Sequence, residues 1–125
     1  MEESRMATFK KFEDILAWKK ARETTKLVYQ VTAEGSFSKD FGLRDQLRRA
    51  SVSIMANIAE GFGRRSDKEF ANFLNMAHGS AAECQSHLYV ALDLDYLNQP
   101  QFNQLYEAFG GCSKMVIGLS HHLRK

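Results

Sequence analysis

Lysine and arginine side chains are the residues of this sequence with the clearest capacity to bind a partner by charge. Lys and Arg neutralise phosphate groups and release counterions, so such binding depends on salt and reads little sequence. The candidates are Lys10, Lys11, Lys19, Lys20, Arg22, Arg44, Arg48, Arg64 and Arg65. Acidic residues lie among them, so an ordinary solvated surface is the alternative. Nucleic acid is the leading partner hypothesis.

A second group of polar residues could form a network between helices. Within the region 40–62, four of them fall within about 80° of one another at helical spacing. The group consists of Arg49, Ser53, Asn57 and Glu60, and Glu83 of the following helical region could join it. Because buried charges need partners, we favour a satisfied structural network that fixes helix register. A ligand site and a solvated surface are the alternatives.

Catalytic and metal-binding patterns are weak in this sequence. A di-iron bundle needs Glu-x-x-His pairs, and no glutamate here is followed by histidine at that spacing. Cys84 and His87 have zinc-ligand spacing, but no second pair accompanies them. There is no glycine-rich phosphate loop or nucleophile motif. We therefore expect no enzymatic activity, no metal and no cofactor.

The length and composition describe one small helical domain in a reducing compartment. The chain has 125 residues, 44% of them hydrophobic and 26% charged, with one proline and a net charge of +2. Two cysteines do not suggest a disulfide framework. No apolar stretch has the length to span a bilayer. We expect a cytoplasmic protein without a membrane partner, with a flexible leader at 1–11 and one domain at 12–125.

Apolar periodicity predicts four helices, and they carry most of the candidate residues named above. The spacing predicts helices over 14–34, 40–62 and 66–94, and a fourth that begins with Pro100 in its first turn. Gly35 follows the first predicted helix, Gly61 and Gly63 close the second, and Ser66 opens a capping box for the third. Short connections favour an all-α, antiparallel up-down four-helix bundle.

The two middle helices are short of charge on the sides that would face water. Residues 50–59 carry no charged side chain, although a surface helix of a monomer places charges outward. The small or apolar residues expected there are Val52, Ala56, Ala59, Gly79 and Ser80. Large exposed apolar surfaces are rare on monomers, so these residues indicate a homo-oligomer interface. The alternative is a well-covered helix pair within one bundle.

Several stretches together resemble the signature of a known family. They are QLRRAS at 46–51, SI at 53–54, NIAEG at 57–61, GR at 63–64, KEF at 68–70 and GSAAE at 79–83. With matches at 12–18 and 96–97, the chain resembles a bacterial four-helix bundle family encoded by intervening sequences of large-subunit ribosomal RNA genes. The likeness extends over about residues 12–123. Met55 and His78 depart from the pattern, where relatives often carry proline and arginine.

The resemblance implies an antiparallel four-helix bundle that assembles as a homopentamer and has no known enzymatic activity. The same fold serves as the accessory protein of diversity-generating retroelements, a basic pentamer that binds RNA and a reverse transcriptase. We therefore expect a non-catalytic oligomeric module with RNA as the favoured partner. The alternative is a protein-only scaffold ring that recruits a protein such as a reverse transcriptase.

Overall fold

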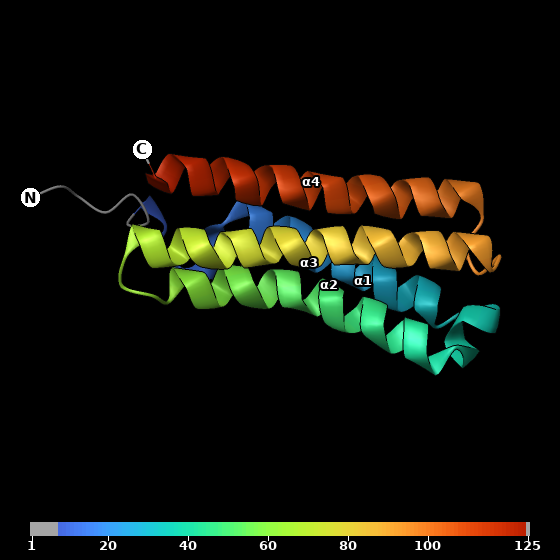
Figure 1. Cartoon of the computed structure of the whole chain (residues 1–125). Helices are drawn as coiled ribbons and strands as arrows, with labels where there is room; N and C mark the ends of the chain where they lie inside the picture. The colour runs from blue at the N-terminus through green and yellow to red at the C-terminus, as the bar shows by residue number, and fades with distance from the viewer. Residues whose placement is uncertain (1–7, 125) are drawn as a thin grey trace, which may run out of the picture.

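The computed structural model describes residues 8–124, and all of its long elements are helices. The chain forms a short 3-10 helix η2 (Phe12–Asp14), then α1 (Leu16–Thr32), the 3-10 helix η3 (Gly35–Lys39), α2 (Phe41–Phe62), α3 (Asp67–Asp93) and α4 (Gln99–Arg124). No strand occurs between residues 8 and 124. The predicted all-α four-helix bundle is confirmed (Figure 1).

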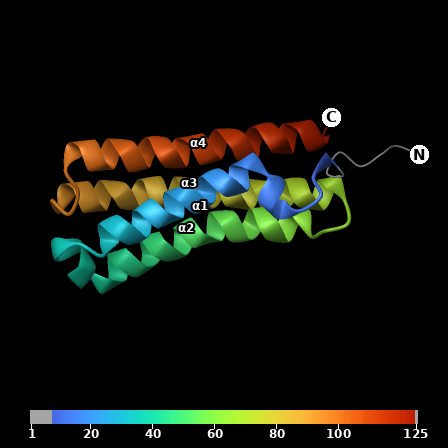
Figure 2. The same cartoon turned by 180° about the vertical axis from the view of Figure 1, so that it is seen from behind.

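The helices pack as a closed ring in chain order. α2 contacts α1 and α3, α4 contacts α3, and α1 closes the ring against α4. Figure 2 shows that α1 runs at an angle to α3 and α4. We call the end with the start of α1, the α2–α3 loop and the end of α4 the terminal end (Figure 1). The opposite end, with η3 and the α3–α4 turn, is the distal end.

The core consists of the apolar stripes that the sequence predicts for α2, α3 and α4. Leu47, Ile54, Leu88, Phe109 and Val116 are fully buried. Small residues of α3 complete this face, namely Ala77, Ala81 and Cys84, which are also fully buried. Burying these side chains removes apolar surface from water, which is the main favourable term in folding. The helix pairs α2–α3 and α3–α4 pack most extensively.

Spacing by threes and fours predicts Ile15, Trp18, Thr25, Val28, Tyr29 and Thr32 as the buried stripe of the first helix. Ile15, Thr25, Val28 and Thr32 are buried as predicted, whereas Tyr29 is 44% exposed. α1 also buries the small residues Ala17, Ala21 and Thr24. The threonine hydroxyls donate to carbonyl oxygens one turn earlier, at 2.7–2.8 Å. This local bonding lets α1 bury hydroxyls close to its neighbours and leaves Tyr29 at the edge.

Side chains cap three of the helices. The Asp40 carboxylate accepts from the Leu43 N–H at 3.1 Å, and Ser66 Oγ accepts from the Glu69 N–H at 3.1 Å. At α4, Asn98 and Gln101 bond each other's backbone N–H, both at 2.9 Å. These bonds satisfy N–H groups that lack a partner inside the helix. The start of α3 at the predicted capping serine is therefore confirmed.

Two glycines take roles other than those predicted. Gly35 does not end α1, which stops at Thr32, but has φ +51° and begins η3. Gly61 does not end α2 but lies buried inside it, and Gly63 is the C-cap. A Cβ on Gly61 would lie 2.5 Å from Phe73 Cβ. Gly61 is therefore needed for the close approach of α2 and α3.

The predicted leader at 1–11 is only partly within the described residues, since residues 1–7 lie outside them. Within it, the Phe9 ring packs edge-on against Phe62, with centroids 6.4 Å apart. Phe12, at the predicted start of the domain, packs on Trp18 in the same manner at 5.1 Å. Phe9 therefore already contributes to the packing of the terminal end.

Candidate nucleic-acid interface

The nine basic residues singled out from the sequence do not form one surface. Because α1 begins and α2 ends at the terminal end, most of them lie in that half of the bundle. These are Lys10, Lys11, Lys19, Lys20, Arg22, Arg64 and Arg65. Arg44 and Arg48 lie in the first two turns of α2, at the distal end. The structure therefore divides the predicted set into two groups.

The terminal group is mostly open to solvent. Lys10, Lys11, Lys19 and Arg65 are exposed. Arg64 forms an ion pair with Glu60, with Nη2 and Oε1 3.0 Å apart, and lies over the Phe73 ring at 4.7 Å. Both partners of that pair are about half exposed, so it contributes little to stability. These cations can therefore be redirected to an external anion at low cost.

The distal arginines are held by other parts of the chain. Arg44 bonds Asp45 at 2.9 Å, donates to the Ser38 carbonyl at 3.0 Å and lies over the Phe41 ring. These contacts join the start of α2 to η3, so Arg44 has a structural role in this end of the bundle.

Arg48 links α2 to α1. Its Nε donates to Thr32 Oγ1 at 2.8 Å, and its guanidinium lies 4.5 Å from the centroid of the Tyr29 ring. Thr32 is fully buried. Phosphate binding by Arg48, which the sequence predicts, would therefore compete with its hydrogen bond to Thr32 of α1.

The remaining charges follow the same division along the bundle axis. Among residues 8–124, basic side chains outnumber acidic ones in the terminal half, and acidic side chains outnumber basic ones in the distal half. In the terminal half, the further cations are Lys68, Lys114 and Arg124, and the acidic residues are Glu13, Asp14, Glu23, Glu60, Asp67 and Glu69. In the distal half, the further cations are Lys26, Lys39 and Arg49, and the acidic residues are Glu34, Asp40, Asp45, Glu83, Asp93, Asp95 and Glu107. The mild net charge of +2 thus conceals a positive terminal half.

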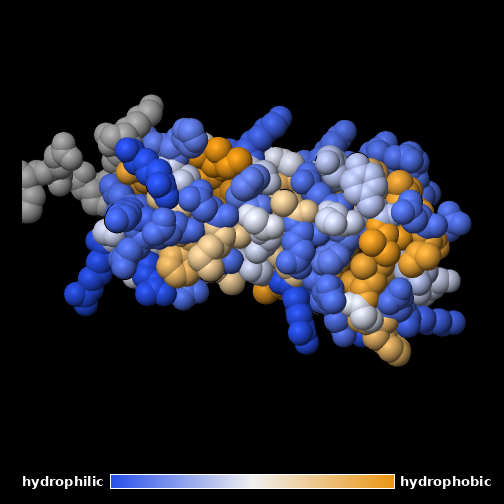
Figure 3. All heavy atoms as spheres, viewed as in Figure 1, coloured by the Kyte–Doolittle hydropathy of each residue, from blue (hydrophilic) through white to orange (hydrophobic). Residues whose placement is uncertain are grey.

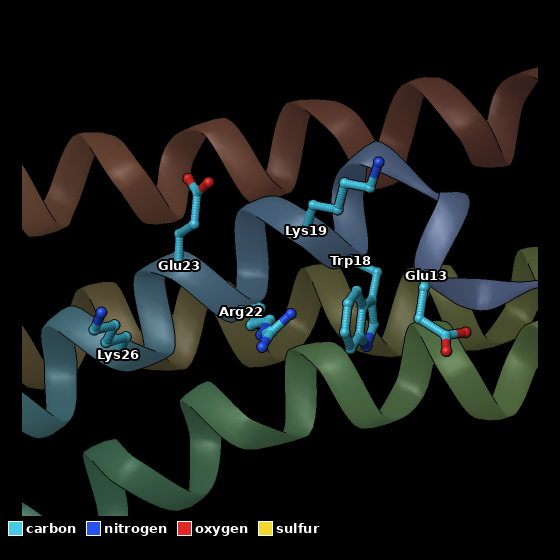
Figure 4. A pocket seen from close by; sticks show the side chains of 6 residues that line it. All are labelled: Glu13, Trp18, Lys19, Arg22, Glu23 and Lys26. Carbon is cyan, nitrogen blue, oxygen red and sulfur yellow. The ribbon is translucent and has the colours of Figure 1, made fainter.

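A surface hollow of about 510 Å³ lies along α1 and extends from the positive half to Lys26 of the distal half. Its lining residues are Glu13, Trp18, Lys19, Arg22, Glu23 and Lys26. In Figure 4, Trp18 and Arg22 point from α1 toward α2, and Glu13 comes from η2 beside them. The Arg22 guanidinium lies 5.7 Å from the centroid of the Trp18 ring. Basic and aromatic side chains therefore meet in one concave place.

The predicted five-residue network does not form within one chain. Asn57 Nδ2 donates to Ser53 Oγ at 3.0 Å, and Ser53 Oγ bonds Ser80 Oγ of α3 at 3.0 Å. Glu60 pairs instead with Arg64, and Glu83 with His87 at 3.3 Å. Arg49 is exposed. Helical spacing placed Arg49, Ser53, Asn57 and Glu60 on one face, but that face lies at the edge between α2 and α3. Ser53, Asn57 and Ser80 are half-buried there, and the charged residues are exposed.

The predicted interface residues all lie on the outer side of the bundle. Val52, Ala56 and Gly79 are exposed, and Ala59 and Ser80 are half-buried. The three α2 residues line a shallow apolar groove of about 290 Å³ with Phe12, Trp18 and Met55. In the space-filling view, hydrophobic atoms also gather toward the distal end of the α2–α3 face (Figure 3). Exposed apolar residues at this end include Phe41 of α2, Val90 of α3 and Leu94, which follows α3.

The two cysteines are free and buried in the middle of the bundle. Burial raises the pKa of the Cys84 thiol far above its usual range, and the Glu83 carboxylate adds to the shift. Burial likewise raises the pKa of Cys112, and its contact with Thr24 opposes the shift. Within residues 8–124, no three His, Cys, Asp or Glu residues are placed to hold a metal ion. None of the helices there is both long and apolar enough to cross a membrane.

Sequence reasoning missed the aromatic partners of the arginines. Arg22, Arg44, Arg48 and Arg64 each lie over an aromatic ring. Two of these pairs have a signal in the sequence, because Trp18 and Arg22 stand four residues apart and Phe41 and Arg44 three apart in one helix. The other two join different elements: Arg48 of α2 lies over Tyr29 of α1, and Arg64 of the α2–α3 loop lies over Phe73 of α3. No helical spacing reveals them. The Asn98–Gln101 cap also had a local signal that went unused.

The sequence matches one family model over most of its length. The model is that of the 23S rRNA-intervening sequence protein, and it matches residues 13–118. This range contains the four helices except for the last residues of α4. No curated protein matches the chain.

A solved structure has the same fold. It is the crystal structure of a protein of unknown function from the S23 ribosomal protein family, from Bacteroides thetaiotaomicron. The two chains are 24% identical and superpose with a TM-score of 0.76. The similarity covers 84% of this chain and 98% of the other. At this identity, the likeness supports the fold and leaves the role to be argued from the residues.

Proposed function

Because this chain belongs to the family of 23S rRNA-intervening sequence proteins, we propose that it is a non-catalytic RNA-binding module whose terminal end contacts the phosphate backbone. The observation that carries the proposal is the uneven distribution of charge. Exposed cations outnumber acidic residues at the terminal end, whereas Arg44 and Arg48 of the distal end are bonded within the chain. A positive patch on one face is the electrostatic footprint of nucleic-acid binding.

The physics of phosphate binding defines what this interface would do. Lys10, Lys11, Lys19 and Arg65 would neutralise phosphates and release counterions, so affinity would fall steeply with salt. Such contacts carry no base information, so we expect little preference among RNA sequences. The module would therefore bind structured RNA by charge and shape. Free cysteine thiols favour a reducing cytoplasm as its place of action.

Self-assembly would strengthen this interface. The outer side of α2 and α3 presents Val52, Ala56 and Gly79 to solvent, and the family resemblance favours a pentamer. Five copies with a net charge of +2 each would carry about +10 in one particle. Ala56→Glu would place a charge on this face, and we expect it to reduce the particle to monomers in analytical ultracentrifugation. A variant that sediments like the parent would contradict this placement.

A matched pair of variants tests the RNA-binding end. Lys10→Ala/Arg65→Ala removes two terminal cations, and Lys39→Ala/Arg49→Ala removes two exposed cations of the distal half. We expect the terminal variant to weaken binding to a folded 23S rRNA fragment and to lower the slope of log affinity against log salt by about 2. The distal variant should behave like the parent. Equal losses in both would contradict the proposal.

The protein-only scaffold is the alternative that the apolar residues favour. Phe41, Val90 and Leu94 are exposed at the distal end, where a protein partner such as a reverse transcriptase could bind. The same assay separates the two functions. If the parent binds neither the 23S rRNA fragment nor an unrelated hairpin at low salt, RNA binding is excluded and the scaffold is favoured.

A further inference from the structure

The hollow along α1 contains an arrangement that phosphate binding alone does not require. Three of its six lining residues are cations, namely Lys19, Arg22 and Lys26, and one is Trp18. Its volume of about 510 Å³ is within the range of roughly 300–1,000 Å³ typical of small-ligand sites. A hollow that combines an aromatic ring with cations can take a flat ring and a phosphate together.

Trp18 is only partly used by the fold. The ring is half-buried, with Phe12 edge-on against it. It lines the apolar groove with Val52 and Ala56 as well as the charged hollow. Packing against η2 and α2 thus explains the apolar side, while the side beside Arg22 faces the hollow (Figure 4). A leucine at position 18 would pack equally well in the apolar groove, but only an aromatic ring also offers a stacking surface to the hollow.

We propose that this hollow binds an unpaired nucleotide of an RNA strand, with its base stacked on Trp18 in the place that the Arg22 guanidinium holds in the free protein. The phosphates on either side would lie on Lys19, Arg22 and Lys26, which follow one another along α1. Stacked bases and a positively charged track are the two elements of single-strand recognition. The inference rests on the proposed RNA-binding function and assigns the substrate as single-stranded, or looped, RNA.

The two carboxylates of the hollow fit a nucleotide better than a bare phosphate. Glu13 and Glu23 would repel an isolated phosphate. Each can accept a hydrogen bond from a base amino group or from a ribose 2′-hydroxyl. The base and sugar would therefore occupy the hollow, and the phosphates would lie at its basic margin. Because DNA lacks the 2′-hydroxyl, we expect RNA to bind more tightly than DNA of the same sequence.

The single tryptophan makes this site directly observable, since Trp18 is the only one in the sequence. We expect a short single-stranded oligoadenylate to quench its fluorescence saturably, and an abasic strand of the same charge to leave the fluorescence unchanged. Trp18→Leu should lower the affinity for the oligoadenylate about fivefold or more, as for loss of one stacked base. The affinity of this variant for blunt duplex RNA should stay within about twofold of the parent's affinity.

Two control variants keep the experiment decisive. Trp18→Phe retains a ring and should restore most of the single-strand affinity, which separates stacking from a packing defect. Tyr29→Leu removes another half-exposed ring of α1, in the distal half, and should not affect binding. RNA that binds with no quenching, or binds Trp18→Leu unimpaired, overturns this inference and leaves the proposed function intact. No binding of any RNA at low salt overturns both.

Discussion

The terminal and distal ends of the bundle carry arginines in two different states. At the distal end, Arg44 and Arg48 each combine a hydrogen bond to another segment with a position over an aromatic ring. At the terminal end, Arg65 and Lys10 are exposed, and Arg64 has one exposed ion pair. Arg44 and Arg48 thus join segments of their own chain, whereas the terminal cations Lys10 and Arg65 face solvent.

The difference shows that the type of residue does not decide the role of a cation. The number of acceptors and rings within reach decides it. η3 and the C-terminal turn of α1 place a carbonyl, a hydroxyl and a ring around the first turns of α2. The α2–α3 loop offers Arg65 no comparable surroundings. Arg44 and Arg48 should therefore matter for stability, and the terminal cations for binding.

The largest expected effect concerns the close helix contact that supports the terminal end. A Cβ on Gly61 would lie 2.5 Å from Phe73 Cβ and 3.0 Å from the Phe70 ring, so α3 would have to move. We expect Gly61→Ala to lower the free energy of unfolding by about 2 kcal/mol, despite the better helix propensity of alanine. Urea denaturation measures this change.

Gly118→Ala is the matched control for that variant. Gly118 also lies inside a helix in the terminal half, and nothing is within 4 Å of the position of its Cβ. Here alanine should raise the free energy of unfolding, by up to about 1 kcal/mol. Equal effects of the two substitutions would show that α2 and α3 can separate at Gly61 without cost.

The next effect tests the comparison itself. Arg48→Ala removes the bond to Thr32 Oγ1 and the contact with Tyr29. We expect it to lower the free energy of unfolding by about 1.5 kcal/mol, as for a hydrogen bond to a charged donor. Arg65→Ala should change stability by less than about 0.5 kcal/mol, because it is an exposed substitution. Chemical denaturation of both variants, with RNA affinity measured in parallel, gives the two readouts.

The opposite pattern would remove the distinction between the ends. If Arg48→Ala left stability unchanged but weakened RNA binding as much as Arg65→Ala, the distal arginines would belong to the interface. The nine cations predicted from the sequence would then act as one set. The stability measurement alone decides whether the Thr32 bond contributes in solution.

A smaller effect compares the caps at the two ends. Asn98 and Gln101 bond each other's backbone at the distal start of α4, and Ser66 caps α3 at the terminal end. We expect Asn98→Ala and Ser66→Ala each to cost about 1 kcal/mol, because each removes one side-chain bond to a first-turn N–H. Hydrogen exchange of the first-turn amides of each helix measures the local loss. Faster exchange at both helices in either variant would mean that the caps act globally.

The sequence predicted the elements of this fold because their signals are local. Asp40 and Ser66 mark helix starts, and Pro100 falls in the first turn of α4 as expected. Apolar residues at spacings of three and four identified the buried faces of α2, α3 and α4, where burial is deep. Each of these features depends on residues within one or two turns of one another. Local rules therefore sufficed for the helices and their order.

The site was less predictable because it depends on how the helices cross. Helical spacing placed Arg49, Ser53, Asn57 and Glu60 on one face but could not give the depth of that face. The slant of α1 brings Tyr29 and Thr32 to Arg48. These contacts join residues 16 or more positions apart in sequence. Spacing within a helix carries no information about them.

The smallest effect appears only at high pH, at the distal end. Tyr96 donates to Asp40 Oδ2 at 3.0 Å, and this bond raises the pKa of Tyr96 above its ordinary value of about 10. Because the neutral phenol makes the bond, its contribution is complete below pH 10 and is lost as pH rises through the raised pKa. The parent should therefore exceed Tyr96→Phe in urea midpoint at pH 8, with the difference shrinking by pH 11. Asp40 caps α2 through its other oxygen in both proteins, so a difference that stays constant with pH would show that the Tyr96 hydroxyl does not bond Asp40 in solution.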